Sequence, residues 1–127
     1  MKREIKFRAW DKENKKMKYN ITGIEYGNGD GNINGIFIDG DIHEIEKIEL
    51  MQYTGLHDKN GKEIWENDIV EITREGIYEK GIIIFKNGCF FIKSKENLLA
   101  LYNCELNNYK VKVIGNITDN PELLGGE

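Results

Sequence analysis

The fold of this chain is decided by residues 50–70, which read LMQYTGLHDKNGKEIWENDIV. Residues 50–54 and 63–65 carry the apolar and aromatic side chains that are common in strands, and they flank the sequence DKNG at 58–61. That sequence predicts a tight turn, because asparagine and glycine tolerate positive φ. Residues 66–68 predict a second turn, after which another strand begins. The segment therefore predicts short strands joined by tight turns.

An alternating pattern predicts an N-terminal hairpin over residues 4–21. Apolar side chains at positions 5, 7 and 9 alternate with Lys6 and Arg8, which is the period of a half-buried strand. The polar stretch 11–16 follows, and the alternation then resumes at Met17 and Tyr19. In such a hairpin these basic side chains are expected to face solvent: Lys6, Arg8, Lys16 and Lys18.

The next segment is less regular. Glycines at 23, 27, 29, 31 and 35 predict a mobile loop or the tip of an extended hairpin, since glycine is costly to order. Residues 36–38 predict a short strand. Residues 41–50 favour a short helical turn, because isoleucine recurs there at every third position.

Strand signals dominate the second half of the chain. The apolar run at 81–85 predicts a central strand, and Asn87-Gly88 predicts the turn into a strand at 89–92. Ser94 predicts the N-cap of a short helix over 95–103. Residues 109–117 predict the last strand. A final helical turn is expected at Asn120-Pro121, since proline is favoured at the first helical position.

Together these signals predict a mainly β protein, of the β-rich α+β kind. Turns at intervals of about 8–12 residues favour a small barrel or sandwich. We expect one domain over residues 1–127. It would hold the N-terminal hairpin and connecting strands in 1–65, an SH3-like barrel in 66–117, and a C-terminal turn and tail in 118–127. One or two short helices would accompany the barrel.

The composition favours a cytoplasmic protein. The chain has 127 residues, 31% charged and 39% hydrophobic, and no apolar run reaches the ~20 residues of a transmembrane helix. Its N-terminus is charged and has no apolar signal segment. Cys89 and Cys104 form no CxxC pattern, so we expect reduced thiols. No membrane association is expected.

The net charge of −4 conceals a basic N-terminus. Residues 1–18 hold eight basic and three acidic side chains, so they carry +5 and the remainder carries −9. Such a segment is either a solvated hairpin or a nucleic-acid surface. In the second case cations would contact phosphates and a ring would stack on a base, the candidates being Lys6, Arg8, Trp10, Lys15, Lys16 and Lys18.

Residues 30–41 fit the pattern D-x-N-x-N-G-x5-D, which is close to an EF-hand calcium loop. The candidate ligands are Asp30, Asn32, Asn34 and Asp41. Two observations count against calcium: the last position is aspartate where the bidentate glutamate is preferred, and no helix is predicted before the loop. Glycine and asparagine also gather in loop tips for backbone reasons. We expect a loop tip without metal, with calcium as the alternative.

Catalytic patterns are weak. Ser94 is the only serine and has no GxSxG context. Cys89 or Cys104 would need His43 or His57 beside it, which the sequence cannot place. There is no GxGxxG, Walker or HExxH motif. We therefore expect no enzymatic activity and no cofactor.

Three segments together resemble the YopX family, small proteins found mainly in bacteriophages and prophages of Gram-positive bacteria. They are KFRAWD at 6–11 followed by Lys16-Met17, the segment at 50–70, and VIGNI at 113–117 followed by NPELL at 120–124. Trp65 stands where tyrosine is usual in the family, and Asn67 where glycine is usual. Asparagine tolerates the left-handed conformation, so we expect that turn to persist.

The resemblance implies a phage gene product acting in the bacterial cytoplasm, and it implies no catalytic residues. We expect a non-enzymatic accessory protein that binds a host protein, a phage protein or a small ligand. A homo-oligomer is one expectation, because exposed strand edges must be covered. Tyr53, Trp65 and Asp68 are the candidate ligand or partner surface. Nucleic-acid binding by the basic hairpin is the alternative function.

Overall fold

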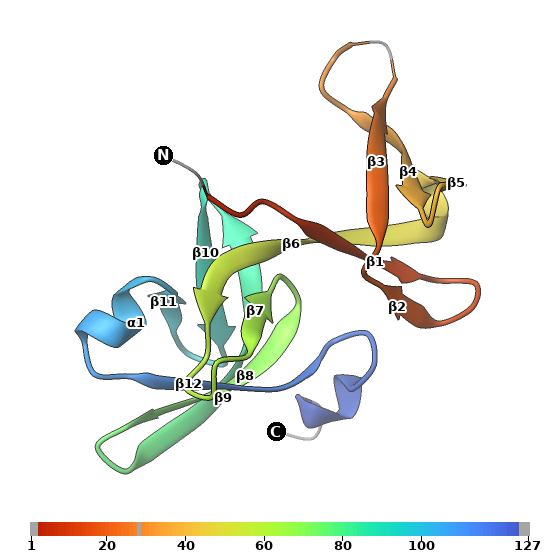
Figure 1. The fold of residues 1–127 in the computed structure, drawn as a ribbon. Helices are drawn as coiled ribbons and strands as arrows, with labels where there is room; N and C mark the ends of the chain where they lie inside the picture. The colour runs from red at the N-terminus through yellow and green to blue at the C-terminus, as the bar shows by residue number, and fades with distance from the viewer. Residues whose placement is uncertain (1–2, 28, 125–127) are drawn as a thin grey trace. The chain divides into compact units, whose positions relative to one another are not determined.

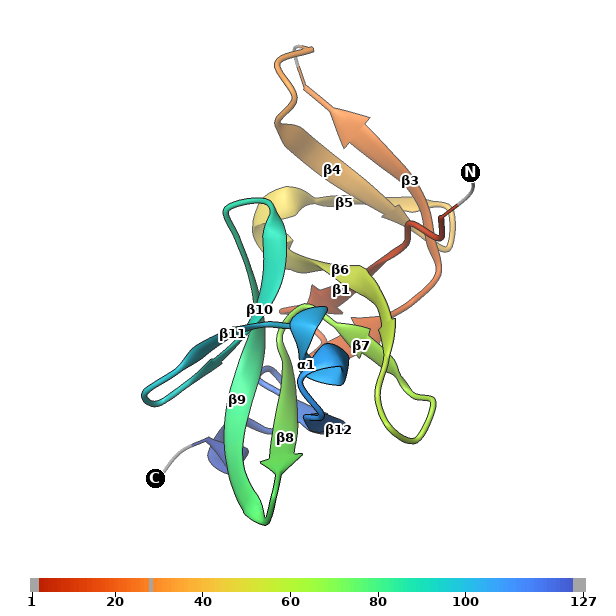
Figure 2. The same ribbon diagram turned by 90° about the vertical axis from the view of Figure 1, so that its left-hand side faces the viewer.

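The computed structural model describes residues 3–27 and 29–124, and the predicted mainly β class is confirmed (Figures 1 and 2). Residues 1, 2 and 28 and the end of the predicted tail, 125–127, lie outside the described residues. The strands are β1 (Phe7–Asp11), β2 (Lys16–Lys18), β3 (Ile21–Tyr26), β4 (Ile33–Ile38), β5 (Asp41–Glu44), β6 (Ile48–His57), β7 (Glu63–Trp65), β8 (Asp68–Arg74), β9 (Ile77–Lys86), β10 (Cys89–Ser94), β11 (Leu98–Ala100) and β12 (Lys110–Asn116). The helical turns are η1 (Ile45–Lys47), α1 (Asn103–Leu106) and η2 (Pro121–Leu123).

The chain forms two compact units, Met1–Gln52 and Tyr53–Glu127, here called the N-terminal unit and the C-terminal unit. Strand β6 crosses the boundary between them. Its first half pairs with β1, and its second half pairs with β7.

The N-terminal unit contains the predicted hairpin. Strands β1 and β2 are antiparallel, with Trp10 opposite Met17. Asp11 closes the turn, since its Oδ1 accepts the N–H groups of Glu13 at 3.0 Å and Asn14 at 3.1 Å. The pKa of Asp11 is lowered chiefly by the hydrogen bond from the Asn14 side chain. The apolar side of the unit packs around Ala9, Ile36, Ile38 and Ile48.

The glycine-rich segment is an extended hairpin, as one of the two sequence interpretations holds. Strand β3 pairs with β4, and β4 pairs in turn with β5, to give a three-stranded sheet. Gly29 and Gly31 lie at the tip with φ of 73° and 86°, the left-handed region that glycine enters most readily. The predicted helical turn within 41–50 is reduced to the single turn η1, because residues 41–44 pair with β4 instead.

The C-terminal unit holds a curled five-stranded antiparallel sheet in the order β11-β10-β9-β8-β12, within the segment predicted to be the barrel. The predicted central strand lies within β9 and is central in the sheet. Two-residue turns at Glu75-Gly76 and Asn87-Gly88 connect β8, β9 and β10, and all four residues have positive φ. That conformation matches the twist of the strands that it joins. The core on one face includes Val70, Ile72, Ile83, Ile92 and Val113.

The prediction of a helix over 95–103 is wrong. Leu98–Ala100 form strand β11, which pairs with residues 91–93 of β10. Ser94 ends β10 in a turn, where its backbone N–H donates to Asn97 O at 2.9 Å and its Oγ accepts the Asn97 N–H at 3.1 Å. Between β11 and β12, the described helical structure is the single turn α1. Pairing with β10 gives the leucines of this segment a strand partner, which outweighs their helix propensity. The final turn predicted at Pro121 is confirmed as η2.

Candidate ligand pocket

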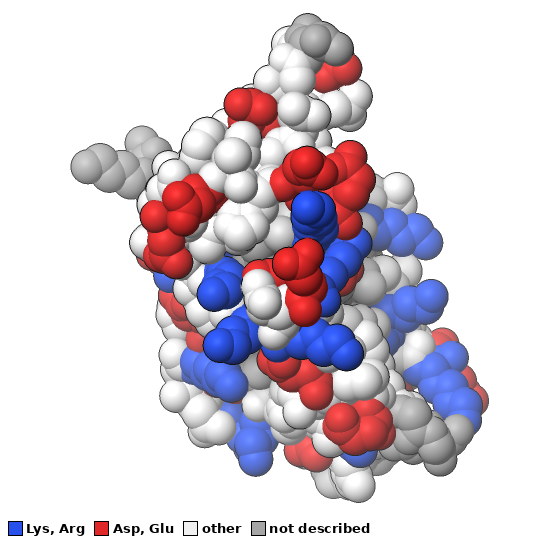
Figure 3. All heavy atoms as spheres, turned by 90° about the vertical axis from the view of Figure 1, so that its right-hand side faces the viewer, with Lys and Arg blue, Asp and Glu red and all other residues white. Residues whose placement is uncertain are grey.

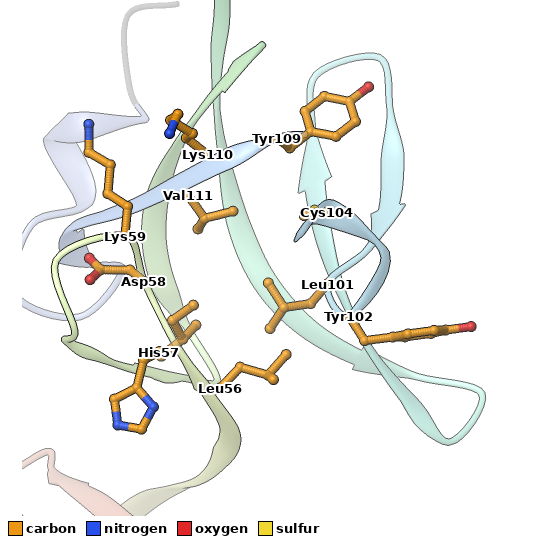
Figure 4. Close-up of a pocket in the computed structure, with 11 residues that line it drawn as sticks. Leu56, His57, Asp58, Lys59, Leu101, Tyr102, Cys104, Tyr109, Lys110 and Val111 are labelled. Atoms are coloured by element: carbon orange, nitrogen blue, oxygen red, sulfur yellow. The ribbon is translucent and has the colours of Figure 1, made fainter. Parts of the chain in front are cut away.

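A pocket of about 380 Å³ lies in the C-terminal unit, between the loop that follows β6 and the chain that joins β11 to β12 (Figure 4). Its floor is apolar, because Ile64, Leu101, Cys104 and Val111 are all buried. Leu56 is 37% exposed and points toward Leu101 (Figure 4). The centre of the pocket is therefore apolar, with a leucine at its entrance.

Polar side chains surround this apolar centre. The rings of Tyr102 and Tyr109 are directed away from it (Figure 4). The Arg74 guanidinium lies 5.1 Å from the centroid of the Tyr109 ring, within the range of a cation–π contact. Lys59 and Lys110 are exposed and add two positive charges to the rim. Apolar lining with a few polar groups is the usual anatomy of a small-molecule site.

Asp58 holds one wall of the pocket in place. Its Oδ1 accepts the backbone N–H groups of Asn60 and Lys62, each at 2.9 Å, and its Oδ2 accepts the N–H of Val113 at 2.9 Å. Burial raises the pKa of this carboxyl, but the N–H donors of Val113, Lys62 and Asn60 together lower it below its ordinary value of 3.8. Asp58 is a buried anion whose partners belong to the fold.

The same loop covers the outer edge of β12. Lys59 N–H donates to Val111 O at 2.9 Å, two residues before the Val113 N–H that Asp58 accepts. The other edge of β12 pairs with β8. Sequence reasoning identified the DKNG turn but missed this long-range role of Asp58. An aspartate at the start of a turn signals only the local bonds, to Asn60 and Lys62.

The three residues predicted to form a ligand or partner surface are buried, so that part of the prediction is wrong about their exposure. Tyr53 and Trp65 are register partners on β6 and β7, with ring centroids 5.5 Å apart. Asp68 Oδ2 accepts the Trp65 N–H at 2.8 Å and closes the turn between β7 and β8. Aromatic side chains bury large areas, and aromatic pairs across neighbouring strands stabilise a sheet. These residues support the sheet.

Beside this cluster lies His57, which also lines the pocket. Its ring is 6.1 Å from the Tyr53 ring in an edge-on arrangement, and Nδ1 lies 3.5 Å from Tyr53 Oη. The ring points away from the apolar centre (Figure 4). Its imidazole therefore contributes to the rim of the pocket.

The predicted nucleic-acid surface is only partly exposed. Arg8 is buried, and its Nε donates to Met51 Sδ at 3.3 Å. Arg8 and Met51 are register partners on β1 and β6, so the alternation directs Arg8 to a covered face and the predicted solvent position is wrong. Trp10 is half-buried.

The lysines of the hairpin differ among themselves. Lys15 and Lys16 are exposed at its turn, whereas Lys18 is half-buried. Lys6 forms an ion pair of 3.3 Å with Glu4. Figure 3 shows one face of the molecule, on which lysine and arginine side chains are interspersed with aspartate and glutamate. The structure therefore places Lys15 and Lys16 together in solvent and separates Arg8 from them.

The structure does not bring the predicted calcium ligands together. Residues 33–38 are the extended strand β4, which separates Asp30 at the hairpin tip from Asp41 at the start of β5. Asp30 Oδ1 accepts the Asn32 N–H at 2.9 Å, and Asn34 Nδ2 donates to Glu25 Oε1 at 3.3 Å. An EF-hand ligand set must curl around one ion, which a strand prevents.

Two of the three groups considered as nucleophiles have structural roles. Cys104 is buried and its thiol donates to Ala100 O at 3.6 Å. Burial raises the pKa of this thiol, which favours the unreactive protonated form. Ser94 is part of the turn before β11. Cys89 is exposed.

Two kinds of feature are absent from the described residues. No group of three or more His, Cys, Asp or Glu side chains among them could hold a metal ion. Within the same residues, no helix is long and apolar enough to cross a membrane.

Fold and pocket define a small, mainly β protein with a ligand-sized apolar pocket beside its five-stranded sheet. The family model described as YopX protein matches residues 6–125, and the chain belongs to this family, as its sequence resemblance indicated. Comparison with curated proteins gave no match.

Two solved structures share this fold. The crystal structure of protein EF1440 from Enterococcus faecalis is 29% identical, with a TM-score of 0.75 over 97% of this chain and 99% of that chain. The crystal structure of protein yopX from Bacillus subtilis is 22% identical, with a TM-score of 0.65 over 93% of this chain and 96% of that chain.

Proposed function

We propose that this protein is a non-enzymatic binding protein whose pocket holds a small organic anion with an apolar or aromatic body. The observation that carries the proposal is the pocket of about 380 Å³, which has an apolar floor and two exposed lysines at its rim. Its volume lies in the roughly 300–1,000 Å³ range of small-molecule sites. The floor would bury the body of the ligand, and the lysines would pair with its charge.

The sign of the charged side chains in the pocket lining supports an anionic ligand. Asp58 also lines the pocket, but its two oxygens accept three backbone N–H groups. Lys59 and Lys110 are the other charged side chains in the lining.

A binding role agrees with the state of the candidate nucleophiles. The Cys104 thiol lies at the pocket but is buried with a raised pKa, and Ser94 belongs to a turn. We place this activity in the cytoplasm of a bacterium that carries a phage or prophage, on the basis of the family resemblance. Self-association through free strand edges is part of the same proposal.

Nucleic-acid binding by the N-terminal hairpin is a weaker alternative than the sequence indicates. Nucleic-acid binding needs a cluster of exposed cations, and Arg8 cannot be part of such a cluster because it is buried. Lys15 and Lys16 are the exposed pair that such a function would use.

The test uses thermal stability with a panel of nucleotides and aromatic carboxylates, because a ligand that binds the folded state raises Tm. We expect at least one compound to raise the Tm of the wild type, with at least tenfold weaker binding in the double variant Lys59→Ala, Lys110→Ala. The matched control is Lys62→Ala, Lys112→Ala, which removes two lysines from the same loop and strand that do not line the pocket.

Native mass spectrometry of protein from expressing cells adds the subunit count and any retained ligand. A panel that leaves the wild-type Tm unchanged, together with a bare mass, would contradict the proposal. If the control variant lost as much binding as the Lys59→Ala, Lys110→Ala variant, the ligand would bind outside this pocket.

A further inference from the structure

A second hollow, of about 800 Å³, is lined by residues of β9 and β10 in the C-terminal unit, by Lys95 and by Leu124, the last described residue. Figure 2 shows β9 and β10 side by side, with the C-terminal segment close to β8 and β9. Here this hollow is called the β9–β10 groove. It shares no lining residue with the pocket proposed above.

Cations dominate the charged lining of the groove. They are Lys80, Lys93 and Lys95, against one carboxylate, Glu79. The Glu79 oxygens accept the Asn97 side-chain amide at 3.2 and 3.3 Å, which ties that carboxylate to the turn before β11. Lys93 and Lys95 are exposed. Three lysines around one groove are complementary to a chain of negative charges.

The fold positions two of these lysines. Lys80 Nζ donates to Leu123 O at 3.4 Å, which places its ammonium beside the C-terminal segment. Lys93 lies opposite Ile82 in the strand register, and Ser94 lies opposite Gly81. Lysines from both strands therefore lie close to Ile82, an apolar residue of the lining.

An exposed aromatic ring lies in the same groove. Tyr78 is 64% exposed, and its neighbour Ile77 is 75% exposed. Both are at the start of β9, where the two-residue turn at Glu75-Gly76 brings the strand out of β8. Burial of this ring by a partner would remove a large apolar surface from water.

We propose that the β9–β10 groove binds single-stranded nucleic acid. The lysines would contact phosphates, and Tyr78 would stack on a base beside Ile82. A cationic groove with an aromatic platform is the recurring design of proteins that bind single strands without sequence preference. An acidic peptide would use the lysines but would not depend on the ring of Tyr78.

The test is fluorescence anisotropy with a fluorescein-labelled oligothymidylate of about 12 nucleotides, titrated with the full-length protein at several salt concentrations. We expect binding at low salt that falls with added salt. Lys93→Glu with Lys95→Glu should weaken binding at least tenfold. The same variant should reduce the slope of log K against log salt by about 1.4, because each phosphate that is no longer neutralised lowers that slope by ~0.7.

Substitutions of the ring separate nucleic acid from other anionic partners. Tyr78→Ala should weaken binding by about 5- to 150-fold, the loss that corresponds to stacking of one base. Tyr78→Phe should keep the affinity. The charge-matched control is Lys15→Glu with Lys16→Glu in the N-terminal hairpin, which should bind like the wild type.

Three results would overturn the proposal. They are no anisotropy change for the wild type at low salt, an unchanged affinity in Tyr78→Ala, or a loss in the hairpin control equal to that of the groove variant. The altered lysines are exposed, so these variants should fold, and far-UV circular dichroism verifies this.

Discussion

At the scale of single residues, Asp58 joins a local turn to a distant strand. The same carboxylate accepts N–H groups from its own loop and from Val113, 55 positions along the chain. Hydrogen bonds to charged groups each contribute about 1.5–3 kcal/mol to stability, and removal of the acceptor leaves buried donors without a partner. Asp58 therefore stabilises both the pocket wall and the edge of the sheet.

We predict that Asp58→Ala lowers the free energy of unfolding by roughly 2–3 kcal/mol at neutral pH. The folded-state pKa of Asp58 is lowered, so its stabilisation is complete above its ordinary value of 3.8 and is lost as the pH falls through the folded-state value. The difference between wild type and variant should therefore shrink in acid.

Urea unfolding of both proteins between neutral and acidic pH measures this difference. Asp30→Ala is the matched control, because Asp30 makes a similar turn bond to Asn32 on a fully exposed hairpin tip. A control that loses as much stability as Asp58→Ala would show that the long-range bond to Val113 contributes nothing.

Two other residues show what a sequence reveals at this scale. Asn67 has φ of 71°, so the left-handed turn predicted from its tolerance of positive φ is confirmed. Arg8 shows the limit. The alternation of Arg8 with apolar neighbours predicts which residues lie on the same face of the strand. It does not predict that other residues cover this face, so the burial of Arg8 could not be anticipated.

At the scale of elements, the centre of the five-stranded sheet depends on a glycine. A Cβ on Gly81 would lie 2.6 Å from Ile92 Cγ2 and 3.0 Å from Lys93 O, closer than side chains normally approach. Strands β9 and β10 cannot separate to make room, because Gly81 is paired on both sides, with Val70 and Ser94.

We predict that Gly81→Ala destabilises the protein by about 1–3 kcal/mol, the usual range for overpacking. Thermal or urea unfolding gives this value. Gly27→Ala is the control, since a Cβ there would lie 3.7 Å from Asn34 Cβ, an ordinary contact. If both variants unfolded at the same urea concentration, close packing at Gly81 would not be the cause.

Turn chemistry made most of the elements predictable. Asn87-Gly88 predicts a two-residue turn from its own conformational preferences, and the strands on both sides then follow from their apolar residues. Leu98–Ala100 could not be assigned in this way. Three residues show no period, and their strand state depends on pairing with β10. The candidate pocket could not be predicted from the sequence either, because its floor combines residues from segments that are distant along the chain.

At the scale of the whole molecule, the two compact units have cores of different size. The cluster around Val70, Ile83 and Ile92 in the C-terminal unit includes more buried side chains than the cluster around Ile36 and Ile48 in the N-terminal unit. Regions with fewer buried apolar contacts open with lower free energy.

We predict that amides of β3 and β4 exchange with deuterium at least roughly tenfold faster than those of β8 and β9, which corresponds to about 1.4 kcal/mol in opening free energy. Hydrogen exchange followed by mass spectrometry of peptides measures both hairpins in one sample. Equal protection of the two hairpins would mean that the chain unfolds as a single cooperative body.

The loop at 58–62 also has a consequence for solubility. By bonding to Val111 and Val113 it occupies the edge of β12 at which a strand from another molecule would otherwise add. Displacement of the loop would leave that edge open while the rest of the sheet remained intact, and a folded molecule with an open edge is a template for fibril growth. Asp58 thus protects one edge of the sheet as well as stabilising its own turn.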